Sequence, residues 1–211
     1  MEYETEEQQV EALKAWWDDN GRAVIAGVVL GAAIIAGWTF WQSRQEGRAV
    51  EASEQFSRTM SAVAADDAAA VTAQADALAD EHDGTLYAAY ASLAAARAAV
   101  EGGDLDAAAE RLAWAAENAP QEDVRLIARV RLARVEGARG DAAAALERLP
   151  DEYPESFTGL IEEARGDLLV LGDETDAARA AYEKAQASGN VADPEALDMK
   201  LDDLAVAENA S

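Results

Sequence analysis

The chain has 211 residues, half of them hydrophobic, and its 42 acidic residues against 17 basic ones give a formal charge of -25. This acid excess excludes a nucleic-acid surface built from clustered lysine and arginine, and it disfavours binding to anionic lipid. The absence of cysteine excludes disulfides, thiolate nucleophiles and thiolate metal sites. Much of the hydrophobic half is alanine, the strongest helix former, so the composition predicts an all-α fold.

An acidic arm, residues 1–22, precedes an uncharged run, residues 23–41. As a helix this run would be about 28 Å long, close to the hydrocarbon thickness of a bilayer. A buried core helix is rarely uncharged on every face, and a signal peptide would have a basic start and a small-residue cleavage site. The run ends instead in Trp38, Phe40 and Trp41, which is typical of an aromatic belt at a membrane interface. We therefore predict an uncleaved transmembrane helix.

Basic residues flank the run on both sides, with Lys14 and Arg22 before it and Arg44 and Arg48 after it. Counting these charges leaves the orientation in the membrane open.

Within the run, Gly27 and Gly31 form a G-x-x-x-G pair, a spacing that lets another helix approach closely in lipid. This pair is a candidate helix contact. The alternative is that glycine is simply common in membrane helices.

Residues 42–211 indicate helices arranged in pairs. A glycine-aspartate turn joins the two helices of a pair at residues 103–104, 140–141 and 172–173. In each turn we expect the glycine to end one helix in a left-handed conformation and the aspartate to cap the next. Units of about 34 residues are typical of tetratricopeptide repeats. We expect 42–82 to supply one or two leading helices, and 191–207 to form a terminal capping helix.

Groups suited to catalysis or metal binding are scarce. His82 is the single histidine, and we expect it at the surface beside a turn. Pairs such as Asp66-Asp67 and Asp202-Asp203 are more simply solvated helix ends than cation sites. We predict no enzyme activity, no cofactor and no metal.

A candidate groove follows from the repeats, because the first helix of each pair lines the concave face of such a stack. Tyr87 and Tyr90 are three residues apart on one such helix, and Arg125 and Arg129 are four apart on the next. Aromatic and arginine side chains are typical of protein-binding hot spots, so these four residues are candidates for contact with a partner or client chain. The alternative is that the tyrosines fill the core and the arginines pair with acids such as Glu122.

The segment "QQVEALKAWWDDNGRAVIAGVVLGAAIIAGWTFWQSRQ", followed by "RLARVEGARGDAAAALERL" and "RGDLLVLGDETDAARAAYEKA", resembles the YfgM family of ancillary subunits of the bacterial SecYEG translocon. The resemblance implies a cytoplasmic N-terminus, one inner-membrane helix and a periplasmic tetratricopeptide-like domain. It also implies a complex with the translocon and a membrane-anchored PpiD-type prolyl isomerase. The implied role is to help secreted and outer-membrane chains pass from the channel to periplasmic chaperones.

Two other classes of function stay open on the residues alone. One is a membrane-anchored repeat scaffold for another envelope assembly, such as pilus or division machinery. The other is a hydrolase that works through paired carboxylates.

Overall fold

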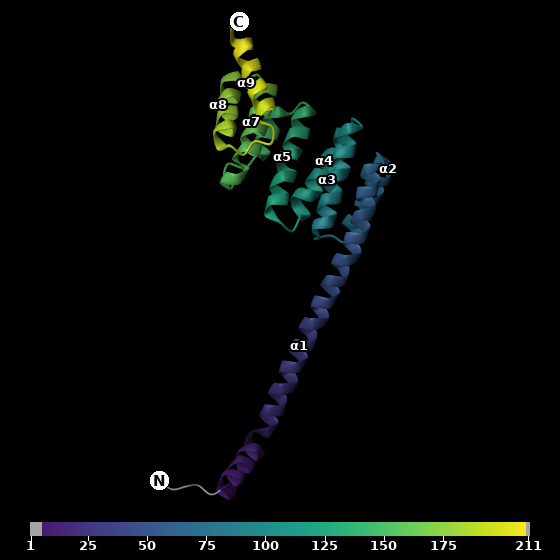
Figure 1. Ribbon diagram of the computed structural model, residues 1–211, viewed down its shortest axis with the longest axis vertical. Helices are drawn as coiled ribbons and strands as arrows, with labels where there is room; N and C mark the ends of the chain where they lie inside the picture. The colour runs from purple at the N-terminus through teal and green to yellow at the C-terminus, as the bar shows by residue number, and fades with distance from the viewer. Residues whose placement is uncertain (1–5, 210–211) are drawn as a thin grey trace, which may run out of the picture. The chain divides into compact units, whose positions relative to one another are not determined.

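The computed structural model describes residues 6–209, with side chains for residues 9–11, 13–42 and 47–205. Every regular element in this part of the chain is helical, which confirms the all-α prediction. The chain divides into two units, Met1–Val50 and Glu51–Ser211, which are described separately. Figure 1 labels the helices: α1 (Glu6–Ala64), α2 (Ala68–Glu81), α3 (Leu86–Glu101), α4 (Leu105–Asn118), α5 (Glu122–Ala138), α6 (Ala142–Arg148), η1 (Glu155–Phe157), α7 (Thr158–Leu171), α8 (Thr175–Ser188) and α9 (Pro194–Asn209).

Helix α1 begins in the first unit and ends in the second. Its sequence contains no proline, and its glycines are spaced singly, so nothing interrupts the backbone hydrogen bonds for 59 residues. From Glu6 onward the helix therefore covers the described part of the predicted arm, the predicted anchor and the first helix of the repeat unit without a break.

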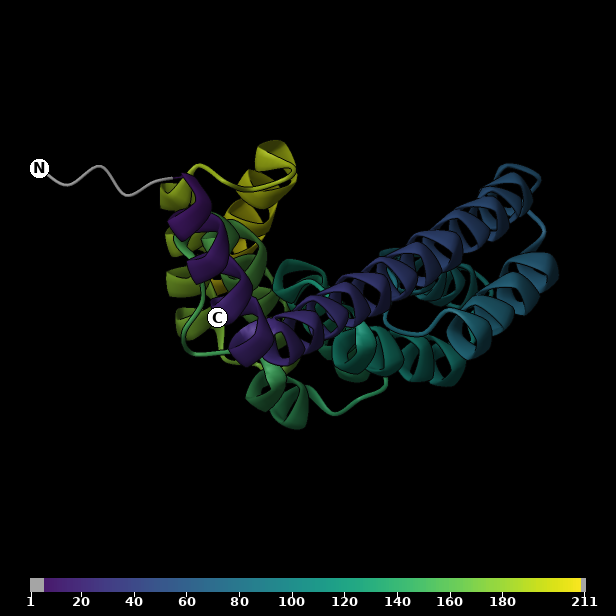
Figure 2. The same ribbon diagram turned by 90° about the horizontal axis from the view of Figure 1, so that it is seen from below.

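In the second unit, each helix from α2 onward packs against the next one in the chain, as expected of a repeat stack. Ala52 of α1 shares a core cluster with Val71 and Leu78 of α2. The helices follow one another in chain order in Figure 1 and in the turned view of Figure 2. Helix α6 has only seven residues, and α5 packs directly against α7 as well as against α6. The final helix, α9, packs on α8, as predicted for a terminal cap.

Two of the three predicted turns between paired helices have the expected conformation, and in the third the left-handed residue is one position later. Gly103 and Gly140 have positive φ, and the following Asp104 and Asp141 cap the next helix by accepting a backbone N–H three residues on. At the third predicted turn, Asp173 rather than Gly172 takes the left-handed conformation. Helix α8 then begins after Glu174, whose side chain makes no capping hydrogen bond. The predicted roles of glycine and aspartate are therefore wrong for this turn.

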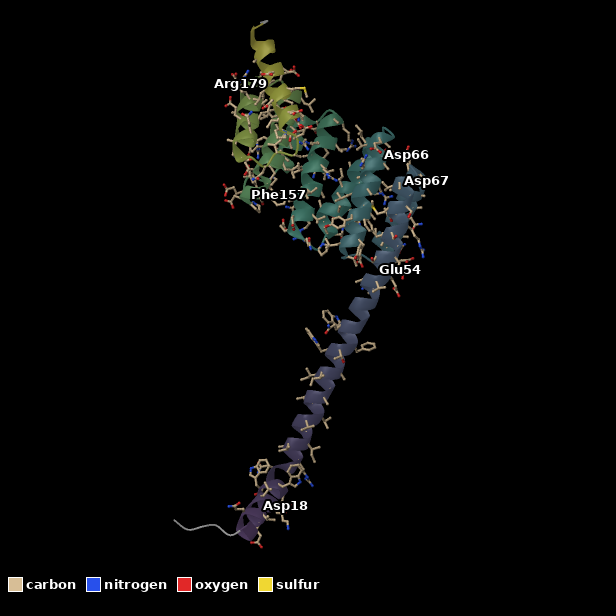
Figure 3. The ribbon with its side chains drawn as sticks, in the orientation of Figure 1. Asp18, Glu54, Asp66, Asp67, Phe157 and Arg179 are labelled. Carbon is tan, nitrogen blue, oxygen red and sulfur yellow. The ribbon has the colours of Figure 1, made fainter. Side chains whose placement is uncertain are left out.

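A fourth turn of the same kind joins α1 and α2. Asp66 has a φ of 56°, and the Asp67 carboxylate accepts a hydrogen bond from the Ala70 N–H at 3.0 Å (Figure 3). Asp66, Gly103 and Gly140 are spaced by 37 residues each, so α1–α2 is the first helical pair of the stack. This aspartate pair thus has a structural role that the sequence did not reveal.

Small side chains bring the helices close together. Four alanines of the paired helices are buried at these contacts: Ala95, Ala108, Ala133 and Ala145. At Gly166 an added Cβ would collide with the ring of Tyr182, so the absence of a side chain on α7 lets α8 approach.

An ionic cluster ties α5, α7, α8 and α9 together. The Lys200 ammonium lies 2.7 Å from both Glu163 and Asp167, and Asp167 also accepts a hydrogen bond from the Tyr182 hydroxyl at 3.0 Å. Burial and the neighbouring Asp167 carboxylate raise the pKa of Tyr182, so it stays a neutral donor. Arg134 of α5 completes the cluster through Asp167 at 3.2 Å.

Candidate membrane anchor and partner-binding surfaces

The apolar segment 23–41 of α1 turns its large side chains outward. Val28, Ile34 and Ile35 are each more than 60% exposed within the chain. In the described part of the chain, this is the one helix long and apolar enough to cross a membrane, with a mean hydropathy of 2.2 and no burial against protein. The hydroxyl of Thr39 donates to the Ala36 carbonyl at 3.0 Å, so its polar group is satisfied within the helix.

Aromatic side chains flank this segment at both ends. Trp38 and Trp41 lie with ring centroids 5.5 Å apart, and Trp16 and Trp17 are half-exposed before the segment begins. Trp17 and Trp38 are separated by about 32 Å of helix, which matches the hydrocarbon thickness plus its edges. The second tryptophan pair was missed in the sequence, although "WW" six residues before the apolar run is a readable signal.

Gly27 and Gly31 lie one helical turn apart and share a face. No atom outside the local backbone lies within 4 Å of a Cβ added at either position. Within the chain, therefore, these glycines leave a strip of bare helix surface. A helix contact at this strip stays a prediction. Arg44, one of the basic residues counted after the apolar run, has its side chain outside the described residues.

The candidate tyrosines lie on α3 beside the last turns of α1. Tyr87 is half-buried against the core, with its ring centroid 5.7 Å from that of Phe56. Tyr90 is more exposed and lies 6.2 Å from the same ring. Both rings thus contribute to packing between α1 and α3.

The candidate arginines occupy a different place. Arg125 donates to the Glu122 carboxylate at 2.9 Å and to the Ala119 carbonyl at 2.6 Å, and Arg129 lies 3.7 Å from Glu122. Both line a cavity of about 700 Å³ together with residues of α4 and α6. The tyrosine pair and the arginine pair therefore lie at different places and make different contacts. The arginines pair with Glu122, as the alternative interpretation expected. Whether any of the four contacts a partner stays a prediction.

A surface that the sequence did not reveal lies on α1, α3 and α5. A cavity of about 560 Å³ extends from Met60 and Val63 of α1 across α3 to Arg131. A second cavity, of about 290 Å³, adjoins it between α3 and α5. Leu93, Arg97 and Arg131 line both, so the two form one depression, which we name the α3–α5 groove.

His82 is buried at the end of α2, which corrects the expectation of a surface histidine. Its backbone carbonyl accepts a hydrogen bond from the Thr85 hydroxyl at 2.8 Å, and its N–H donates to Leu78 at 3.0 Å. The residue helps form the turn into α3. Among the described residues, no group of three or more metal-ligating side chains comes together.

Residues 14–206 match the tetratricopeptide repeat-like domain family. The ancillary SecYEG translocon subunit of Haemophilus influenzae is 32% identical over 199 residues, which cover 94% of this chain and 97% of that protein. The ancillary SecYEG translocon subunit of Escherichia coli is 32% identical over 205 residues, 97% of this chain and 98% of that protein. The Neisseria gonorrhoeae protein of the same name is 25% identical over 202 residues, covering 94% and 97%. No solved structure matches the chain. The chain thus belongs to the tetratricopeptide repeat-like family that these ancillary translocon subunits represent.

Proposed function

We propose that this protein is a non-catalytic ancillary subunit of the SecYEG translocon. One observation carries the proposal: the likeness to two ancillary subunits, at 32% identity, extends over nearly the whole length of both chains. The family match begins at residue 14, ahead of the apolar segment, so it includes the candidate anchor as well as the repeats.

In this proposal the protein crosses the bacterial inner membrane once, through residues 23–41. The outward apolar side chains and the two tryptophan pairs support a position within lipid, because in water this surface would stay uncovered. The N-terminal arm lies in the cytoplasm and the repeat unit in the periplasm. This orientation follows the family resemblance rather than the balance of basic residues.

The repeat unit would act by binding proteins. It would hold a PpiD-type prolyl isomerase, or secreted and outer-membrane chains on their way from the channel to periplasmic chaperones. A stack of helix pairs is suited to this role, because it presents an extended surface rather than one enclosed site.

Purification from membranes in mild detergent tests the assignment. The translocon and the prolyl isomerase should be recovered with the full chain in amounts that rise together with it. Recovery of pilus or division proteins without the translocon would contradict the proposal and favour an envelope scaffold.

A matched pair of variants tests the anchor's glycines. Replacing Gly27 and Gly31 together with isoleucine should weaken recovery of partners while leaving membrane insertion intact, because branched side chains block close helix packing. Replacing Ala26 and Ala33 with isoleucine adds comparable bulk on the other side of the helix and should change nothing. Equal recovery with both double variants would show that the glycine strip makes no contact.

A further inference from the structure

The α3–α5 groove has apolar walls and a basic centre. Its apolar lining comes from Met60, Val63, Val71, Leu93, Val100, Leu112 and Val135. Arg97 and Arg131 stand where the two cavities meet, and Arg134 lines the smaller one. The larger cavity's volume lies within the range of ligand sites, roughly 300–1,000 Å³.

Arg131 differs from its neighbours on α5. Arg125 and Arg129 pair with Glu122, and Arg134 pairs with Asp167. Arg131 is exposed and makes no ion pair or hydrogen bond with any described residue. In a chain with 42 acidic residues, a guanidinium left without a carboxylate in a groove is open to a carboxylate from another molecule.

The charges that line the groove also determine where an acidic group of a bound chain can lie. Asp66 and Asp67 line the larger cavity at the α1–α2 turn, where they would repel an incoming carboxylate. The favourable position for an acidic group is therefore beside Arg131, next to Leu93 and Val100. Arg97 lies nearby, although it already pairs with Glu101 at 2.8 Å.

We propose that the α3–α5 groove binds a short extended stretch of protein chain with apolar side chains and one acidic residue, whose carboxylate pairs with Arg131. From Leu93 to Glu101 the wall of α3 is about 12 Å long, which accommodates about four residues of extended chain. A nucleic acid or an anionic lipid does not fit, because the domain around the groove is strongly acidic. The proposal deepens the proposed function by naming the chemistry of the bound peptide segment. It rests on that function only for the identity of the proteins from which the segment comes.

Peptide binding to the purified full chain in lipid nanodiscs tests the groove independently of the translocon. The probe is a rhodamine-labelled, amidated peptide, Gly-Ser-Leu-Val-Asp-Leu-Val-Ser-Gly, and its partner carries asparagine in place of aspartate. Fluorescence polarisation should show the aspartate peptide binding about tenfold more tightly than the asparagine peptide. Arg131→Ala should remove this difference and leave binding of the asparagine peptide unchanged. Arg131→Glu should reverse the preference in favour of a lysine-containing peptide.

Arg139→Ala is the matched control, because Arg139 lies at the end of α5, pairs with Asp106 and lines neither cavity of the groove. This variant should bind both peptides as the unaltered protein does. An unchanged preference in Arg131→Ala, or a loss in Arg139→Ala alone, would place the contact elsewhere and overturn the proposal. So would the absence of saturable binding of either peptide below about 1 mM. Self-association that Arg131→Ala abolishes, measured by sedimentation, would assign the groove to a second copy of the chain and likewise overturn it. None of these results bears on whether the translocon co-purifies.

Discussion

Alanine is abundant in both units of the molecule, and its surroundings differ between them. Ala32, Ala33 and Ala36 of the first unit are exposed along with the valines and isoleucines beside them. In the second unit, Ala108 and Ala133 are fully buried, and the large side chain of Leu168 is buried in the same core cluster as Ala133. Over residues 23–41 the first unit thus has an apolar exterior and no buried residue, whereas the second unit has a packed core and a charged exterior. Apolar composition alone does not decide burial; the presence of charge around the helix does.

Truncating a leucine to alanine should give the largest difference between the two units in its effect on stability. Leu168→Ala removes a side chain that is 1% exposed, and should lower the free energy of unfolding by about 2–5 kcal/mol. Leu30→Ala removes a side chain that is 63% exposed, and should leave repeat-unit stability unchanged. Thermal unfolding of the full chain, followed by circular dichroism, measures both. Equal losses would mean that Leu30 is also packed against protein.

A charge at the same position should act on insertion rather than on folding. Leu30→Arg places a guanidinium near the middle of the apolar segment and should cost about 2.5–3.5 kcal/mol of insertion free energy. The fraction of protein that resists extraction from membranes at high pH should fall accordingly. Leu30→Ala is the control at this position and should stay membrane-bound. If the arginine variant were equally resistant, the segment would not be the span.

Added bulk offers a third contrast. Ala133→Leu inserts three carbons into a packed interface and should destabilise the repeat unit by about 1–3 kcal/mol. Ala33→Leu makes the same change on the exterior of the first unit, where it should improve insertion slightly. Unfolding curves and membrane extraction, applied to both variants, would show whether Ala133→Leu lowers stability while Ala33→Leu improves insertion.

The smallest expected effect concerns pH and belongs to the second unit alone. The Glu162 carboxylate is buried, which by itself would raise its pKa, but hydrogen bonds from Tyr153 and from Lys184 at 2.9 Å, with Arg165 nearby, lower the pKa overall. A lowered folded-state pKa means that the ionised carboxylate stabilises the fold above about pH 4.5, and that this stability is lost as the pH falls further.

Glu162→Gln should therefore cost about 1 kcal/mol at pH 7, and the difference from the unaltered protein should shrink between pH 5 and 3. Unfolding measured at several pH values gives this difference directly. A constant difference across the range would show that the charge of Glu162 contributes nothing.

The sequence predicted the helices and the repeat period well, because alanine content, turn glycines and capping aspartates act locally. It missed the α1–α2 turn, since Asp66 adopts there the left-handed conformation usually left to glycine. It also misjudged the third turn, where Asp173 competes with Gly172 for the same conformation.

The α3–α5 groove was harder to predict for a reason visible on α5. This helix packs against α4, α6 and α7, and its buried residues include Val124, Leu126, Ala128 and Val130. A helix covered on several sides has no single apolar stripe, so spacing alone cannot tell which face its arginines occupy. Arg129 and Arg131 read alike in the sequence, yet one pairs with Glu122 and the other lines the α3–α5 groove.

The absence of cysteine allows the most direct test of the proposed topology, in which residues 23–41 lie in lipid, the arm before them lies in the cytoplasm and the second unit lies in the periplasm. Single cysteines at Val10, Val29 and Met199, all exposed within the chain, can be labelled with a membrane-impermeant maleimide in spheroplasts and after lysis. We predict that Met199→Cys reacts in spheroplasts, that Val10→Cys reacts only after lysis, and that Val29→Cys reacts in neither condition. Labelling of Val29→Cys after lysis without detergent, or of Val10→Cys from outside, would contradict this topology.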